Sequence, residues 1–294
     1  MGAYAISRIL TIGEILWDVF PDSERLGGAS FNFSVNARRL GEDVVFLSAV
    51  GEDARGREAR TRAAAYGLDP SFIQIVPGTS TGVVTVQVNA AGQPDFTIHR
   101  PAAYDRLVLD SHLLARLTEW NPDWIYFGTL HQFDPAVRHL TRRLIAALPA
   151  ARKFYDVNLR RDCHSPELVL ELLSIADAVK LNDEEVATVE AMASVRSPSL
   201  GGFTEAWSQR MGWRAVAVTR GKDGCAVRIG HHYAEVPGRV VKVADTVGAG
   251  DAFAAAFWHG IVQSWDPAKV ADFANGVGAM VASLPGALPE WDAH

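Results

Sequence analysis

The chain has 294 residues, of which 48% are hydrophobic and 21% charged, and its formal net charge at pH 7 is −6. This composition is typical of a globular protein, and an acidic chain without a run of Lys or Arg is poorly suited to bind nucleic acid or an anionic membrane surface. Its two cysteines, Cys163 and Cys225, lie far apart and outside any CxxC pattern, which argues against a disulfide framework and a structural zinc site.

Short apolar runs rich in β-branched residues alternate with helical patterns from the N-terminus onward. The runs predict strands at residues 9–15, 44–50, 124–128, 154–158, 178–181, 215–219 and 226–229. Apolar residues at helical spacing predict helices at residues 31–40, 56–66, 111–119, 135–147, 166–174, 183–192, 203–211, 250–263 and 267–284. This alternation favours an α/β fold, a three-layer α/β/α sandwich whose central sheet is mostly parallel.

Residues 82–100 break this rhythm. Residues 82–89 alternate apolar and polar, residues 91–93 have the composition of a turn, and a second extended run ends at Arg100, which together predict a β-hairpin. Residues 16–26, between the first strand and the first helix, are expected to join this hairpin. We therefore predict a single domain over residues 1–294, with a small β-sheet lid built from about residues 16–27 and 80–104.

The glycine-rich segment 245–251 carries the strongest functional signal. A strand-like piece runs through Gly248, Ala249 and Gly250 into an Ala-rich helix. Glycines let backbone N–H groups approach a ligand, and the start of a helix adds unpaired N–H donors and the positive end of its dipole, so the segment predicts a phosphate site. Asp251, in the first helical turn, is placed to take a proton from an attacking hydroxyl. The plainer alternative is that Asp251 only complements the helix dipole.

Residues 245–253 resemble the signature of the ribokinase-like carbohydrate kinases, the phosphofructokinase B-type family. Residues 27–36, 39–41 and 50–53 are similar to the N-terminal Gly-Gly motif of this family, and residues 156–160, 180–185 and 219–224 match later landmarks in the same order. The opening residues 13–21 look most like the fructokinase branch. One departure is Ser30, which stands where the family commonly has proline and which bears on the sugar pocket.

The resemblance implies a ribokinase-like fold and transfer of the γ-phosphoryl group of ATP, with Mg²⁺, to a primary hydroxyl of a monosaccharide. Residues 13–21 favour fructose. Ribose, 2-keto-3-deoxygluconate and nucleosides stay open as acceptors, as does a non-catalytic sugar- or nucleotide-binding protein, because likeness of fold does not fix specificity. An acyl hydrolase using Ser80 is rejected, because a strand-like run follows residues 78–82 where a nucleophile elbow needs a helix. A P-loop kinase is rejected because its motif is absent from the sequence.

The resemblance also implies roles for individual residues on the acceptor side. Asp251 becomes the catalytic base, and Gly248, Ala249 and Gly250 stabilise the charge on the transferring group. Sugar is expected to bind through Asp18, Gly28, Asn32, Asn36, Arg100, Asn158, Arg160 and Asp251. Taken without the family, the residue pattern favours an exposed loop acid for Asp18. The alternatives are a solvated arginine for Arg100 and a residue near a helix cap for Asn32.

On the nucleotide side, the resemblance implies contacts with Asn182, Thr219, Gly221, Gly224, Thr246, Gly248, Gly250 and Asn275. Asn182 and Glu185 are implied to organise Mg²⁺, mainly through water, although the same pair fits a helix N-cap followed by an acid three residues later. Asn275 is alternatively an ordinary helix-surface residue. Asp245, Val247 and Gly286 resemble a monovalent-cation site, for K⁺, found in several members.

Two expectations concern the surroundings of the protein. A lid sheet with one hydrophobic face is suited to pair with its copy in a homodimer. The first residues hold no apolar segment long enough for a signal peptide or a membrane span, so we expect a cytoplasmic protein.

Overall fold

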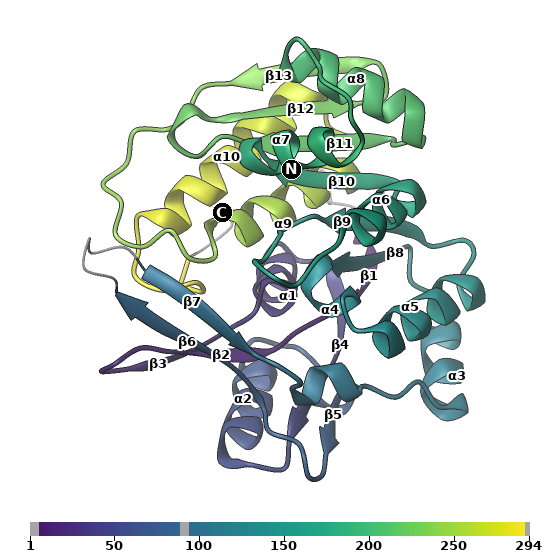
Figure 1. Cartoon of the computed structure of the whole chain (residues 1–294), viewed down its shortest axis with the longest axis vertical. Helices are drawn as coiled ribbons and strands as arrows, with labels where there is room; N and C mark the ends of the chain where they lie inside the picture. Colours follow the sequence, from purple (N-terminus) through teal and green to yellow (C-terminus); the bar gives the residue numbers. More distant parts are fainter. Residues whose placement is uncertain (1–5, 89–93, 292–294) are drawn as a thin grey trace.

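A large sheet forms the centre of the molecule (Figure 1). The structure is a computed structural model that describes residues 6–88 and 94–291, and within these residues nine strands lie in the order β13-β12-β11-β10-β9-β8-β1-β4-β5. All neighbours are parallel except β11–β12 and β12–β13, which are antiparallel. The strands are β1 (Arg8–Ile12), β4 (Asp43–Gly51), β5 (Ile73–Val76), β8 (Trp124–Gly128), β9 (Arg152–Asp156), β10 (Ala178–Asn182), β11 (Ala215–Thr219), β12 (Cys225–Ile229) and β13 (His232–Val236).

Helices cover both faces of this sheet. They are α1 (Ala29–Arg39), α2 (Ala54–Ala65), α3 (Ser111–Trp120), α4 (Thr129–Gln132), α5 (Pro135–Ala147), α6 (Pro166–Ile175), α7 (Asp183–Met192), α8 (Leu200–Met211), α9 (Ala249–Val262) and α10 (Pro267–Ala282), with short 3₁₀ turns at Pro70–Phe72, Ala103–Arg106 and Gly221–Asp223. Ile9 of β1 belongs to one apolar cluster with Trp258 of α9, and the next residue, Leu10, belongs to another with Leu140 of α5. Because successive side chains of a strand point to opposite faces, the two clusters are the two sides of one sheet. The predicted three-layer α/β/α fold is confirmed.

A second, smaller sheet stands apart from the first, at the lower left of Figure 1. Its strands are β2 (Leu16–Val19), β3 (Glu24–Gly27), β6 (Gly82–Val88) and β7 (Pro94–His99), in the order β3-β2-β6-β7. The β2–β6 pair is parallel, and the other two pairs are antiparallel. The strands fall in the two segments predicted to form a small sheet, and the predicted hairpin is present as β6 and β7. Its predicted turn at residues 91–93 lies outside the described residues.

In the large sheet, two strands were not predicted and two predicted strands end earlier than expected. The strands β5 and β13 were not predicted, because Ile73–Val76 is short and His232–Val236 opens on a polar residue. Strand β1 ends at Ile12 rather than at residue 15, so Gly13 and Glu14 leave the sheet and pass beside the start of α1. Strand β9 ends at Asp156, and Asn158 turns away with a φ of 38°. Each shortened strand therefore leaves a polar residue, Glu14 or Asn158, beyond its carboxyl end.

In the described part of the chain, no helix combines the length and the apolar character needed to cross a membrane.

Candidate active site

Helix α9 begins at the glycine-rich segment. Its N-cap, Gly248, has a φ of 80°, a left-handed conformation that favours glycine. A Cβ atom at this position would lie 2.5 Å from the carbonyl oxygen of Ala287, so no larger residue fits without a shift of the backbone. The first N–H groups of a helix lack partners within it and form the positive end of its dipole, so the cleft at this end suits an anion.

Asp251 lies in the first turn of α9 and faces α1. Its Oδ2 accepts a hydrogen bond of 2.8 Å from Nδ2 of Asn32. The pKa of Asp251 is raised to about 6, with burial as the largest cause. The hydrogen bond from Asn32 acts to lower this pKa, and the negative charge of Asp156 acts to raise it. A carboxylate with a pKa of about 6 is ionised at neutral pH and still basic enough to accept a proton from a hydroxyl.

Asn32 is held in the cleft by the way in which α1 begins. The N-cap, Gly28, has a φ of 110°, and a Cβ atom there would lie 2.6 Å from the carbonyl oxygen of Glu14. Glycine therefore lets α1 start directly against the residues that follow β1. The Oδ1 atom of Asn32 is buried and makes no hydrogen bond to any described residue. Buried polar atoms usually have partners, so Oδ1 is a candidate acceptor for a ligand hydroxyl.

Asp18 enters the same cleft from the small sheet. It lies on β2, where a Cβ atom built on Gly27 of the paired strand would be 3.1 Å from Oδ2 of Asp18. Burial raises the pKa of Asp18 to about 6, while Arg160 lowers it and Asp251 raises it. The repulsion between these two carboxylates implies that Asp18 and Asp251 face one space.

That space is a cleft of about 390 Å³. It lies between the small sheet, the start of α1, the carboxyl ends of the central strands and the start of α9. Ligands of open α/β sheets bind at this edge. The predicted site residues that line it are Asp18, Gly28, Asn32, Asn158, Arg160, Asn182, Thr219, Thr246, Val247, Gly248, Gly250 and Asp251.

Comparison with known proteins places this chain in a family. The model of the pfkB family of carbohydrate kinases matches residues 11–293. This chain belongs to the pfkB family of carbohydrate kinases. Among curated proteins it is similar to a fructokinase of Oryza sativa, with 28% identity over 96% of this chain and 93% of the relative, and to a fructokinase of Klebsiella pneumoniae, with 28% identity over 96% and 95%. Among solved structures it is similar to an uncharacterized sugar kinase of Pyrococcus horikoshii in complex with ATP, with 26% identity, coverage of 95% and 93%, and a TM-score of 0.80.

Two charged residues of this carbohydrate kinase line the cleft without having been predicted. Glu14 is buried; its carboxylate oxygens accept the N–H of Ser30 at 3.4 Å and the Ser30 hydroxyl at 3.3 Å. Burial raises the pKa of Glu14 above its usual value. Both donors belong to Ser30, which stands where proline is common in the family. A proline there could make neither bond, because it has neither an N–H nor a hydroxyl. The signal in the sequence was a glutamate directly after a buried strand, enclosed by apolar residues.

Lys180 is the second missed residue. Its ammonium lies 3.1 Å from Oδ1 of Asp156 and 3.4 Å from a Cβ atom built on Gly250, so it sits against the start of α9. Burial lowers the pKa of Lys180, but the charges of Asp156, Glu185 and Asp251 outweigh it, and the net pKa is raised. The signal was a lysine inside a strand that is otherwise buried on both faces, a position that charged residues rarely occupy without a function or a partner.

Two residues predicted to bind the sugar lie outside the cleft. Asn36 is fully buried on α1; its Nδ2 donates to the carbonyl oxygen of Asn32 and its Oδ1 accepts from Trp291. The guanidinium of Arg100 donates to both carboxylate oxygens of Asp105 and to the carbonyl oxygen of Leu130. Neither residue lines the cleft in this structure, and a contact of either one with the sugar stays a prediction. The spacing places Asn36 on the same face of α1 as Asn32. Asn36 lies one turn further along the helix, however, where this face is packed inside the core.

The remaining predicted residues surround the cleft without lining it. The N–H of Ala249 donates to the carbonyl oxygen of Thr246, which leaves this amide to the loop rather than to a ligand. Asn275 on α10 donates to the carbonyl oxygen of Pro237. Gly221 and Gly224 belong to the turn between β11 and β12. Contacts of these residues with a nucleotide stay predictions.

Asn182 and Glu185 form the helix cap that was the alternative to a metal site. Asn182 Oδ1 accepts a hydrogen bond of 2.7 Å from the N–H of Glu185. The Glu185 carboxylate accepts from the N–H of Asn182 at 2.8 Å and from the N–H of Leu159 at 2.8 Å. Among residues 6–88 and 94–291, no group of three or more His, Cys, Asp or Glu side chains is placed to hold a metal. The oxygens of Asn182 and Glu185 are of the type that suits Mg²⁺. This ion commonly keeps several waters and binds phosphate oxygens, so it does not require an all-protein cage.

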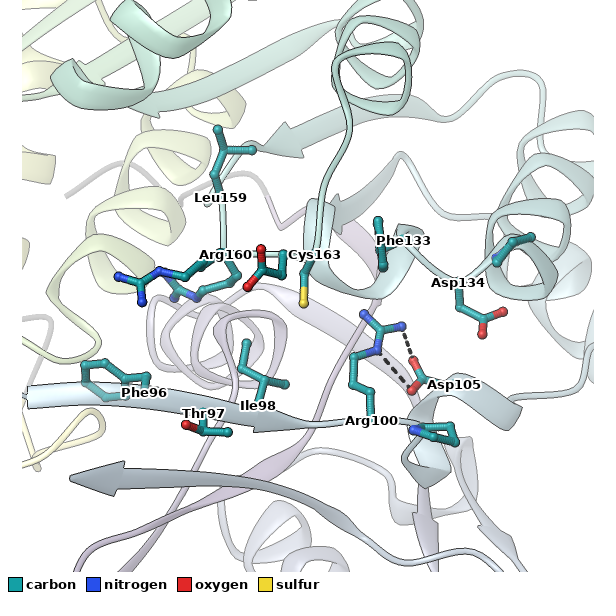
Figure 2. A pocket seen from close by; sticks show the side chains of 14 residues that line it. Phe96, Thr97, Ile98, Arg100, Asp105, Phe133, Asp134, Leu159, Arg160 and Cys163 are labelled. Atoms are coloured by element: carbon teal, nitrogen blue, oxygen red, sulfur yellow. Dashed lines mark hydrogen bonds and ion pairs between the residues drawn. The ribbon is translucent and has the colours of Figure 1, made fainter.

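A wider pocket of about 830 Å³ adjoins the cleft and shares Phe96, Ile98 and Arg160 with it. Figure 2 shows β7, with Phe96 and Ile98, facing the loop that carries Arg160 and Cys163. The ion pair between Arg100 and Asp105 lines the same pocket, below Phe133 in Figure 2. Both Phe96 and Phe133 are exposed here, with 45% and 37% of their surface accessible. These two rings therefore leave the wider pocket open to solvent.

Proposed function

We propose that this kinase transfers the γ-phosphoryl group of ATP to a primary hydroxyl of a monosaccharide, and that the sugar is fructose. The observation that carries the proposal is the position of Asp251: a half-buried carboxylate, held by Asn32, at the start of a helix whose N–H groups suit a phosphate. Fructose is supported by the two fructokinases among the relatives and by residues 13–21 of the sequence.

The sugar is placed between the small sheet and α1 in this proposal. Asp18 accepts hydrogen bonds from sugar hydroxyls, Gly28 allows the ring to approach the backbone, and the free Oδ1 of Asn32 accepts a further hydroxyl. Asp251 takes the proton of the attacking hydroxyl. Arg160, at the junction of the cleft and the wider pocket, is suited to hold phosphate oxygens together with Asn158.

The phosphates are placed at the start of α9. Gly248 and Gly250 offer backbone N–H groups, and the Lys180 ammonium beside Gly250 adds a positive charge against the transferring group. We propose that the nucleotide continues along Thr219, Gly221, Gly224, Thr246 and Asn275. When Mg²⁺ is bound, it neutralises the charge of the phosphates; Asn182 and Glu185 are the residues that would hold its water shell. Catalysis then comes mainly from positioning and electrostatics.

The small sheet acts as a lid in this proposal. Residues 1–294 form one kinase domain, and closure of the small sheet over the cleft excludes water, which would otherwise compete with the sugar for the phosphoryl group. A homodimer formed through the small sheet and a cytoplasmic location remain part of the proposal.

The test is a panel of acceptors at saturating ATP and Mg²⁺, with ADP release measured for each. Fructose is expected to give the highest kcat/KM, with ribose, 2-keto-3-deoxygluconate and a nucleoside well below it. A higher kcat/KM for one of these three would overturn the choice of fructose and leave the kinase intact. If no acceptor stimulates ADP release above the rate with water alone, the assignment of a monosaccharide acceptor is wrong.

A further inference from the structure

Arg25 joins the small sheet to residues 245–250, which lead into the first turn of α9 and are called here the phosphoryl loop. It lies on β3, directly across from Asp18 of β2. Its Nη1 donates to Oδ2 of Asp245 at 2.7 Å. The two residues are 220 positions apart in the sequence, and the bond spans from the sheet that carries Asp18 to the loop that leads to Asp251.

Asp245 organises the phosphoryl loop through the same carboxylate. Its Oδ1 accepts the N–H of Val247 at 3.0 Å, and its Oδ2 accepts the N–H of Gly286 at 3.2 Å in addition to Arg25. The guanidinium of Arg25 lies over the ring of Phe20, 5.0 Å from the centroid, an arrangement that favours a cation. Arg25 is therefore fixed from two sides, by an aromatic face and by a carboxylate.

This arrangement does not fit a monovalent cation at Asp245. Asp245, Val247 and Gly286 do come together, as the family resemblance implies, but through hydrogen bonds that the carboxylate accepts from two backbone N–H groups. The Oδ2 atom of Asp245 already accepts a hydrogen bond from the guanidinium of Arg25. A cation bound to the same carboxylate would stand next to that positive charge, and like charges at such a separation repel each other. Arg25 already supplies the charge that a cation would bring.

We propose that Arg25 is a positioning residue of this kinase, which ties the small sheet to the phosphoryl loop and replaces a monovalent cation at Asp245. Arg25 acts through Asp245 and touches no reacting atom. The kinase is therefore independent of K⁺, and removal of the guanidinium makes it dependent on K⁺. The activity assay for this inference rests on the proposed function, because it needs an acceptor that the enzyme phosphorylates.

The first experiment compares kcat/KM in K⁺ and in tetramethylammonium at equal ionic strength. Wild type is expected to show the same value in both, whereas Arg25→Ala falls about tenfold in tetramethylammonium, an effect of the size expected when a charged hydrogen bond is lost, and recovers in K⁺. Arg25→Lys keeps the charge and stays independent of K⁺. Strong activation of wild type by K⁺, or an Arg25→Ala enzyme that keeps its activity or is not restored by K⁺, overturns the proposal.

Arg55→Ala is the matched control. Arg55 pairs with Glu24, the residue before Arg25 on β3, and the side-chain exposures of this pair, 40% and 42%, resemble the 46% of Arg25. The Arg55 pair makes no contact with the phosphoryl loop, so its loss is expected to leave kcat/KM unchanged in both salts. A loss equal to that of Arg25→Ala would show that any ion pair on β3 matters, and would overturn the specific role of Arg25.

A second measurement needs no turnover. Thermal unfolding of the free protein is followed in the same two salts. Wild type is expected to show no rise in Tm specific to K⁺, while Arg25→Ala gains one, because a ligand that binds only the folded state raises Tm. A K⁺-specific rise in wild type overturns the proposal even if no acceptor has been found, so failure of this inference is distinguishable from failure of the proposed function.

Discussion

The two ends of the cleft, called the phosphoryl end and the acceptor end after the ligands that we propose for them, are built in different ways. At the phosphoryl end, Gly248, Gly250 and Asp251 belong to one continuous segment at the start of a helix, and the groups offered to the ligand are mostly backbone N–H groups. At the acceptor end, Asp18 comes from the small sheet and Asn32 from α1, and the groups offered are side chains. The phosphoryl end is anchored in the large sheet, whereas the acceptor end depends on how two separate parts of the fold meet.

This difference explains why the type of reaction is easier to recognise than the substrate. The anion site needs only a glycine turn and a helix start, which are local features. The sugar site needs residues from segments that are distant in the sequence, and a change in one of them leaves the chemistry intact. Mutations at the two ends should therefore separate into losses of kcat and losses of sugar affinity.

The largest expected effect is at the phosphoryl end. Asp251→Asn keeps the size of the side chain and removes its basicity, so kcat should fall by roughly 10²–10⁴, the usual size of a general-base contribution. Binding of ATP and sugar, measured by calorimetry, should remain. A folded Asp251→Asn enzyme with near-normal kcat would show that Asp251 only complements the helix dipole.

An intermediate effect is expected at the acceptor end. Asp18→Asn should raise KM for the sugar by roughly 10- to 100-fold, the range for loss of hydrogen bonds to a charged group, with KM for ATP unchanged. Because Asp18 and Asp251 both have a pKa of about 6, kcat/KM of wild type should fall about 100-fold per pH unit well below pH 6, once both carboxylates are protonated. In Asp18→Asn that slope should drop to about tenfold per pH unit, since one titrating group remains. An unchanged slope would mean that Asp18 need not be ionised to bind sugar.

The fold was predictable because strand and helix patterns are local. The strands at residues 124–128 and 215–219 have the predicted bounds, and the helices at residues 135–147 and 183–192 do as well. The sequence says least where tertiary contacts decide. Asn36 has the spacing of a site residue, but Trp291, from the other end of the chain, packs against it and takes its Oδ1. Arg100 looked free in the sequence, and only the fold brings Asp105 and Leu130 to it.

The residues missed at the site share one property. Glu14 and Lys180 are charged residues embedded in apolar runs, and each acquires its meaning from partners elsewhere: Ser30 for Glu14, and Asp156 with the start of α9 for Lys180. A sequence shows that such a charge is unusual, but it does not show which segment supplies its interaction partner. The contact of Arg25 with Asp245 is of the same kind, because no local pattern links β3 to the phosphoryl loop.

The smallest effect tests the hydrogen bond from Asn32 to Asp251, which joins α1 at the acceptor end to α9 at the phosphoryl end. The hydrogen bond from Asn32 lowers the pKa of Asp251, so Asn32→Ala should raise this pKa further and move the acid limb of kcat/KM to higher pH. The loss of activity should accordingly be modest at pH 8 and larger at pH 6, because a base with a higher pKa is protonated over more of the acidic range. Asn36→Ala removes the same type of side chain one turn along α1 without touching Asp251, and its acid limb should stay in place. If both variants shift the limb equally, the effect comes from α1 as a whole, and the acceptor end controls the base through packing rather than through this bond.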